Sequence, residues 1–196
     1  MTEPSDGLKL LVDVLDRLGI PYLIGGSLAS SVHGIARATA DVDLIAEIRP
    51  ADVKPLADAL AQHFYADAEM MREAIEIGRP FNLIHYETSF KFDVFPRRSD
   101  AFSQLQFERR QLKLAGLGGG TPVKCAVATA EDIILNKLAW FRLGGEVSEQ
   151  QWNDVRGVIE VRREQLDLPY LRQWSQYLKV DDLLEHVLAQ RHKSRD

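Results

Sequence analysis

Two aspartates separated by a single valine are the first residues in this sequence that can do chemistry. Asp41 and Asp43 lie in DVDLIAEI, residues 41 to 48, a segment that predicts a strand. Alternate residues of a strand point to opposite faces, so both carboxylates share one face while Val42 and Leu44 point into a core. Like charges this close repel each other unless a cation neutralises them, and Mg²⁺ suits carboxylate oxygens. The aspartate pair therefore predicts a metal position.

A third aspartate, Asp93, stands in another predicted strand, FKFDVF at residues 90 to 95. It shares a face with Lys91 and Phe95, and among bulky apolar residues a charge needs a reason. If this strand runs beside the first, the carboxylates can hold two metal ions about 3.5–4 Å apart, as in in-line displacement at phosphorus. Asp93 is then well placed to take a proton from an attacking hydroxyl. For each aspartate taken alone, a strand edge or a solvent-facing position is the ordinary alternative.

A glycine pair and a serine precede the aspartates. Gly25, Gly26 and Ser27 connect a predicted strand at 22–25 to a predicted short helix at 27–34, with Ser27 as its N-cap. Missing side chains and free N–H groups let an anion approach the positive end of such a helix. The turn therefore predicts an anion-binding position, although Gly-Gly-Ser alone is usually a simple turn.

The remaining pattern predicts elements that hold these residues in place. The first two thirds of the chain mix helices and strands, and the last third is helical throughout. The run GLGGG lacks the lysine and Ser/Thr of a P-loop and precedes a strand, so it predicts a hairpin turn. The predicted helices are 5–18, 27–34, 50–63, 130–143, 148–164, 167–177 and 180–190, and the predicted strands are 22–25, 41–48, 80–86, 90–95, 109–115 and 122–128.

Composition narrows the class of protein. The chain has 196 residues, which suits one domain or one domain with a small helical appendage, and its net charge is −5. Proteins that coat nucleic acid usually carry a basic excess, so any nucleic-acid contact must be local. No stretch approaches the ~18 apolar residues of a membrane span, and the first residues carry acids where a signal peptide has bases. We expect a cytoplasmic protein without membrane contact, and a buried apolar role for the single cysteine, Cys125.

In this order, the residues resemble the nucleotidyltransferase superfamily, whose palm is like that of DNA polymerase beta. The resemblance implies an α+β fold: a palm domain at 1–128 with a mixed, mainly antiparallel sheet packed on helices, and a helical C-terminal subdomain at 129–196. It also implies that Gly25, Gly26 and Ser27 hold a triphosphate. The aspartates then bind two Mg²⁺ ions, for which Mn²⁺ can substitute.

Three longer segments narrow the resemblance to bacterial nucleotidyltransferases related to the AbiEii abortive-infection toxins. HGIARATADVDL, residues 33–44, resembles their H-G-x-x-R-x-T-x-D-x-D-L signature. TAEDIILNKLAWF, residues 129–141, resembles their S/T-x-E-D-L-x-x-x-K-L segment. NDVRGVIEV, residues 153–161, resembles the helix written K-D-x-x-D-I, but Asn153 replaces the lysine and Gly157 the second acid.

The same resemblance implies nucleotide-binding roles for Arg37, Thr39, Lys137 and Asp154. Each has an alternative that needs no ligand. Arg37 can pair with one of the aspartates instead of clamping a phosphate, and Lys137 can extend from a buried helix face. Asp154 can simply stabilise the first turns of a helix. His33 is expected to be a packing residue at a helix end.

Three functions follow from these patterns. The first is a metal-dependent enzyme that moves a nucleoside monophosphate from a nucleoside triphosphate to a hydroxyl of RNA such as a tRNA 3′ end, of a protein, or of a small molecule. The second is the toxin of a toxin–antitoxin pair, held in check by an antitoxin protein. The third is a non-catalytic module that binds a nucleotide or a partner. Retention of the aspartates favours an enzyme, whereas the altered segment 153–157 favours the module.

Overall fold

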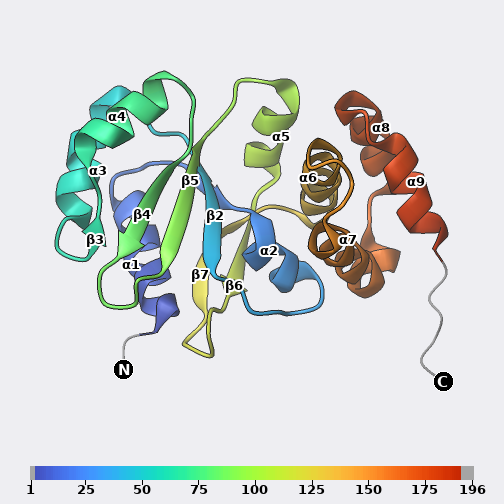
Figure 1. Ribbon diagram of the computed structural model, residues 1–196, viewed down its shortest axis with the longest axis horizontal. Helices are drawn as coiled ribbons and strands as arrows, with labels where there is room; N and C mark the ends of the chain where they lie inside the picture. Colours follow the sequence, from blue (N-terminus) through green and yellow to red (C-terminus); the bar gives the residue numbers. More distant parts are fainter. Residues whose placement is uncertain (1–2, 191–196) are drawn as a thin grey trace.

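A seven-stranded sheet in the order β3-β4-β5-β2-β1-β7-β6 runs through the computed structural model, which describes residues 3–190 (Figure 1). Four neighbouring pairs are antiparallel, and β1–β7 and β2–β5 are parallel, so the sheet is mixed and mainly antiparallel, as expected. The strands are β1 (Tyr22–Ile24), β2 (Asp41–Ala46), β3 (Phe64–Tyr65), β4 (Phe81–His85), β5 (Lys91–Pro96), β6 (Gln111–Ala115) and β7 (Val123–Val127).

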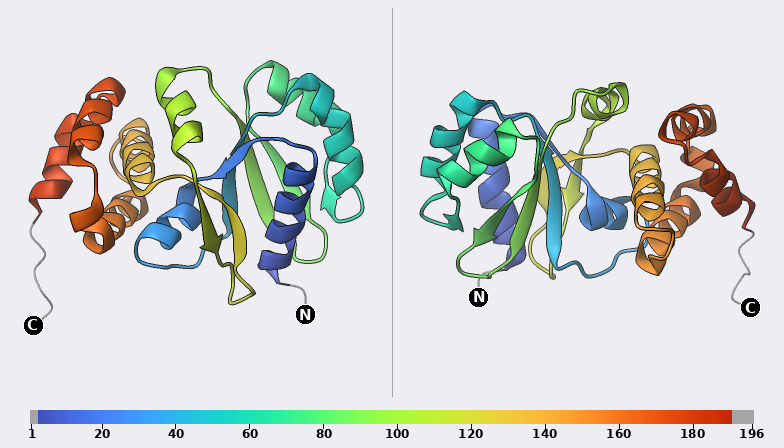
Figure 2. Two further views of the ribbon diagram at one scale, coloured as in Figure 1. Left: turned by 180° about the vertical axis from the view of Figure 1, so that it is seen from behind. Right: turned by 45° about the horizontal axis from the view of Figure 1, so that its top comes forward.

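Helices cover both faces and one end of this sheet. Seen as in Figure 1, α2 lies in front of the sheet and α6 to α9 form a group at one side, while Figure 2 (left) shows α1 on the rear face. The helices are α1 (Pro4–Arg17), α2 (Gly26–His33), α3 (Val53–Leu60), α4 (Ala68–Glu76), α5 (Ala101–Arg109), α6 (Ala130–Leu143), α7 (Glu149–Arg162), α8 (Leu168–Leu178) and α9 (Asp181–Ala189), with short 3₁₀ turns η1 (Pro50–Asp52) and η2 (Arg163–Gln165).

Most predicted elements are present within a few residues of their expected ends, including the helical run from residue 130 onward and the two antiparallel hairpins. Three elements have no counterpart in the prediction: β3, α4 and α5. β3 is only two residues long. In α4, AEMMREAIE, the core-facing residues Ala68, Met71, Ala74 and Ile75 follow helical spacing, so the sequence carried a signal for this helix that the prediction missed.

The alternation of β2 explains how one strand serves both a core and a site. Val42, Leu44 and Ala46 are fully buried, whereas Asp41, Asp43 and Ile45 on the opposite face are only partly buried. The strand therefore anchors its apolar face in the core and presents its carboxylates on the other.

Two simpler expectations can also be compared with the structure. Cys125 is fully buried in β7, which confirms its apolar role. No helix within residues 3–190 is long and apolar enough to cross a membrane. The division into domains at residues 128 and 129 stays a prediction.

Candidate functional site

The parallel pairing of β2 and β5 brings the aspartates together. Asp43 is the register partner of Asp93, and Asp41 is the partner of Lys91. Register partners on neighbouring strands point to the same face and lie about 5 Å apart in backbone position. The condition set by the sequence, that the FKFDVF strand run beside the Asp-x-Asp strand, is therefore met.

The glycine turn at the start of α2 touches this carboxylate face. The N–H of Gly25 donates to the carbonyl oxygen of Asp43 at 2.9 Å. Gly26 has a φ of +54°, and a Cβ at this position would lie 1.7 Å from Oδ2 of Asp43. Only glycine fits here, because any side chain would both collide with the carboxylate and strain the backbone. The glycine turn and the carboxylates of the site thus form one continuous surface.

The prediction that Ser27 caps α2 was wrong. The helix begins at Gly26 with Gly25 as its N-cap, because the left-handed conformation of Gly26 turns the chain into the helix earlier. The hydroxyl of Ser27 instead accepts a hydrogen bond from Nη2 of Arg37 at 2.5 Å.

An ion cluster joins three of the four residues for which the resemblance implies nucleotide binding, namely Arg37, Lys137 and Asp154. Asp154 on α7 accepts two hydrogen bonds from Arg37, from Nε at 2.8 Å and Nη2 at 2.9 Å, and pairs with Nζ of Lys137 at 2.8 Å. The side chains of Asp154 and Lys137 are only 6% and 7% exposed. Burial alone would raise the pKa of Asp154, but the bonds from Arg37 and Lys137 outweigh it and hold this pKa below its usual value. Arg37 therefore pairs with Asp154, not with an aspartate of β2.

The pKa of Asp43 is shifted in the opposite direction to that of Asp154. Burial, and after it the charge of Asp41, raise the pKa of the Asp43 carboxyl, while Lys137 partly offsets them. Asp41 is positioned by Thr39, whose hydroxyl donates to the Asp41 carbonyl oxygen at 2.9 Å. Burial therefore disfavours the charged form of Asp43 more than Lys137 and Lys91 favour it.

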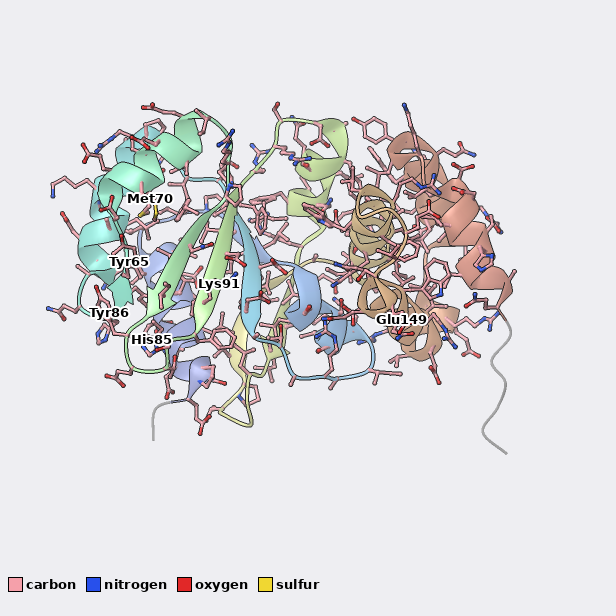
Figure 3. All side chains as sticks on the ribbon, in the orientation of Figure 1. Tyr65, Met70, His85, Tyr86, Lys91 and Glu149 are labelled. Atoms are coloured by element: carbon pink, nitrogen blue, oxygen red, sulfur yellow. The ribbon has the colours of Figure 1, made fainter. Side chains whose placement is uncertain are left out.

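Lys91 is the site residue that the sequence analysis did not assign. Its Nζ lies 2.8 Å from Oδ2 of Asp93 and 3.9 Å from Oδ2 of Asp41. Figure 3 labels Lys91 on β5, next to β2. The signal was in the sequence, because Lys91 stands two residues before Asp93 on the same strand face.

The aspartates of the site offer oxygen ligands that suit Mg²⁺, but in this structure Asp93 and Asp41 are paired with Lys91. In the part of the chain that the structure describes, no three His, Cys, Asp or Glu side chains are gathered closely enough to hold a metal ion. Carboxylate oxygens are nevertheless the ligands that Mg²⁺ prefers, and burial together with the charge of Asp41 raises the pKa of Asp43. By their chemistry Asp41, Asp43 and Asp93 suit the ion, but their side chains are not gathered into a metal site while Lys91 pairs with Asp93 and Asp41.

A cavity of about 670 Å³ extends from this surface toward α5, α6 and α8, a volume typical of small-molecule sites. Its inner end reaches Gly26, Asp43 and Lys137. At its outer end, Trp140 and Tyr177 are each 53% exposed, so aromatic faces are available to a ligand. Further lining residues are Phe95, Arg98, Asp100, Phe102, Gln106, Phe107, Asn136, Leu143 and Gln151.

The departure at Gly157 has no packing reason in the structure, because a Cβ on Gly157 would meet Ile35 at 3.4 Å, an ordinary contact. Gly34, which ends α2, lies so close to α7 that a Cβ on it would be 2.8 Å from the Gly157 carbonyl carbon. Asn153 is exposed, whereas Asp154 keeps its place in the ion cluster. His33 is buried, with Nε2 2.7 Å from the carbonyl oxygen of Ala128, which confirms its packing role. The close contact between α2 and α7 therefore requires glycine at Gly34 and not at Gly157.

Neither a protein-family model nor a curated protein matches the chain by sequence. Solved structures match it by fold. An antigenic nucleotidyltransferase-like protein from Paracoccidioides brasiliensis aligns with a TM-score of 0.54 at 18% identity, over 98% of this chain and 95% of that one.

The antibiotic-resistance factor ANT(2'')-Ia matches in two structures. Its solution structure aligns with a TM-score of 0.51 at 15% identity, over 94% of this chain and 100% of that one. Its complex with adenylyl-2''-tobramycin aligns with a TM-score of 0.53 at 15% identity, over 89% and 95% of the two chains. The chain thus has the α+β nucleotidyltransferase palm with a helical C-terminal portion, as the sequence predicted.

Proposed function

We propose that this protein is a metal-dependent nucleotidyltransferase, which moves a nucleoside monophosphate from a nucleoside triphosphate to a hydroxyl acceptor and releases pyrophosphate. One observation carries the proposal: Gly26 lies against Asp43 so closely that no side chain fits, while Asp93 stands opposite Asp43 on β5. A phosphate-sized anion on the glycine turn would therefore meet the carboxylate face directly, and the two need a metal ion between them.

The phosphates would be held by backbone and cationic groups that the fold keeps in place. Gly25, Gly26 and Ser27 open α2, whose first N–H groups point out of the helix and favour an anion. Lys137 borders both the cavity and Asp154, which fixes its ammonium near the inner end of the cavity. Arg37 is held on both Ser27 and Asp154, so it orients the turn and the ion cluster together.

The chemical step would use the carboxylates in two roles. Asp41, Asp43 and Asp93 would hold two Mg²⁺ ions, or Mn²⁺, which neutralise the phosphates and the charge that develops during transfer. The acceptor hydroxyl forms a bond to the α-phosphorus while the bond from this phosphorus to the pyrophosphate oxygen breaks. Asp93 accepts the hydroxyl proton, and pyrophosphate leaves with the electron pair of the broken bond. Thr39 keeps Asp41 in position through its backbone hydrogen bond.

The cavity offers room for the nucleoside and part of an acceptor. Trp140 and Tyr177 are exposed aromatic faces on which a base can stack. The acceptor would present a hydroxyl at the inner end, near Asp43. An RNA 3′ end such as that of tRNA, a protein side chain and a small molecule all carry such a group, and one structural neighbour is bound to an adenylylated antibiotic.

The proposal is tested by transfer of label. The wild-type protein is incubated with each α-³²P nucleoside triphosphate, Mg²⁺ and a panel of acceptors that includes total tRNA and tobramycin. We expect a labelled acceptor and stoichiometric pyrophosphate, both lost in Asp93→Asn and unchanged in Asp58→Asn, an exposed aspartate of α3 paired with Lys54. Equal transfer by Asp93→Asn and wild type would contradict the proposed chemistry.

The resemblance in residues 33–44 extends the proposal to a toxin role with an antitoxin partner. In that case, expression of the wild-type chain arrests growth of a bacterial host, and expression of Asp43→Asn does not. Growth arrest by both proteins would show that toxicity does not depend on nucleotide transfer.

A further inference from the structure

Lys91 lies where a cation is needed. On β5 it is the register partner of Asp41 and stands two residues before Asp93, so its side chain joins the carboxylate face of the sheet (Figure 3). Its ammonium is 2.8 Å from Asp93 and 3.9 Å from Asp41. Within residues 3–190, Lys91 therefore supplies the ion pairs of both carboxylates.

The two lysines of the site differ in their freedom to move. Lys137 is 7% exposed and is fixed by Asp154, whereas Lys91 is 42% exposed. The flexible four-carbon stem of a lysine lets an exposed ammonium withdraw into water at little cost. Asp93, at 16% exposed, is held on its strand and cannot follow. Lys91 is therefore the mobile partner of the pair.

An ammonium and a divalent ion compete for these carboxylates. At 2.8 Å the ammonium of Lys91 uses Oδ2 of Asp93, and a metal ion bound to the same carboxylate would be repelled by the neighbouring positive charge. Without any cation, in contrast, Asp41, Asp43 and Asp93 repel one another. The carboxylate face therefore has a positive charge beside it in both states: the Lys91 ammonium without a metal ion, and the metal ion itself once it is bound.

We propose that Lys91 is a tethered counter-ion, which holds the carboxylates together in the metal-free protein and has to be displaced when a divalent ion binds. Lys91 thereby weakens metal binding and ties it to the arrival of a triphosphate, whose negative charge favours the exchange. The inference rests on the proposed function, because it takes Asp41, Asp43 and Asp93 as the metal ligands. Lys91 is a positioning residue in this account, since it acts through the carboxylates.

The test is a titration with Mn²⁺ alone, followed by electron paramagnetic resonance of the free ion. Lys91→Met keeps the length of the side chain and removes its charge, and we expect its Kd for Mn²⁺ to fall at least about tenfold, equivalent to ~1.4 kcal/mol. Lys91→Arg keeps the charge and should bind like the wild type. Lys54→Met is the matched control, because Lys54 pairs with Asp58 at 2.7 Å on α3, away from the site.

Thermal unfolding gives a second readout that needs no activity. Without metal, Lys91→Met should melt below the wild type, and saturating Mn²⁺ should remove the difference, whereas Lys54→Met should match the wild type throughout. Lys91→Gln replaces Lys91→Met if the methionine variant does not fold.

Each outcome of the Mn²⁺ titration bears on the counter-ion role of Lys91. An unchanged or weaker Mn²⁺ affinity in the uncharged variants refutes the counter-ion role, and transfer by the wild type would then leave the proposed function standing. If neither wild type nor variant binds Mn²⁺, the counter-ion role falls together with the metal dependence of the proposed function.

Discussion

Replacing Asp154 with alanine should destabilise the protein far more than the loss of an exposed ion pair would. Asp154 is the shared partner of Arg37 and Lys137, and the side chains of Asp154 and Lys137 are almost completely buried. Removing one partner of a buried pair leaves an uncompensated charge, which costs about 3–5 kcal/mol.

The magnitude follows from the exposure of the two cations. Arg37 is 28% exposed and keeps contact with water after the substitution, so most of the cost comes from Lys137 at 7%. We therefore expect the lower part of the range, about 3 kcal/mol. For a chain of this length, that lowers the melting temperature by about 6–12 °C.

The assay is urea and thermal unfolding beside a matched control. Asp182→Ala removes the partner of Arg142, a pair with a separation of 2.6 Å whose aspartate is 65% exposed. Such an exposed pair contributes little, so the control should melt with the wild type. A double variant, Asp154→Ala with Lys137→Met, should recover stability relative to Asp154→Ala alone, because the stranded charge is gone. If Asp154→Ala melts with Asp182→Ala, the buried cluster does not have the role described.

Three further predictions concern the glycine turn, the buried carboxylate and the core. Gly26→Ala should lose the stabilisation by a nucleoside triphosphate, because its Cβ meets Asp43. Gly19→Ala is the control for backbone strain alone, since Gly19 has a φ of +65° and open space around it; equal shifts of melting temperature by the nucleotide in both variants would contradict the contact. Burial and Asp41 raise the pKa of Asp43, so its protonated form stabilises the metal-free fold at low pH and this stability is lost as pH rises through the folded pKa. Asp43→Asn should therefore melt above the wild type at pH 8 and with it below about pH 4; the opposite order at pH 8 would refute the assignment. Burial raises the pKa of Cys125 to about 11, so a disulfide reagent at pH 8 should label this thiol only as fast as the protein unfolds, and immediate labelling would contradict its burial.

The strands of the site could be predicted because their signal is local. DVDLIAEI and FKFDVF alternate between apolar and polar residues, so the face of each aspartate follows from its position alone. Their parallel pairing, with Asp43 opposite Asp93, depends on sheet order, and the sequence supported it only as a condition.

Contacts between segments that are distant along the chain could not be predicted from the sequence. The partner of Arg37 is 117 positions away, on a helix that reaches α2 through the close approach of Gly34 and Gly157. The sequence placed Lys91 on the same face as Asp93, but its second contact, with Asp41, depends on the parallel pairing of β2 and β5. Composition and periodicity do not encode such pairings, since they report the chain one segment at a time.

The most direct test of the central claim is a thermal melt with each of the four nucleoside triphosphates, with and without Mg²⁺, on wild type and Asp43→Asn. A ligand at about 100 times its Kd adds ~2.7 kcal/mol of stability. For this chain length, that corresponds to a rise of roughly 5–10 °C. The account predicts such a rise for the wild type, dependent on Mg²⁺ and lost in Asp43→Asn. A rise that is independent of Mg²⁺, or equal in Asp43→Asn, would contradict it.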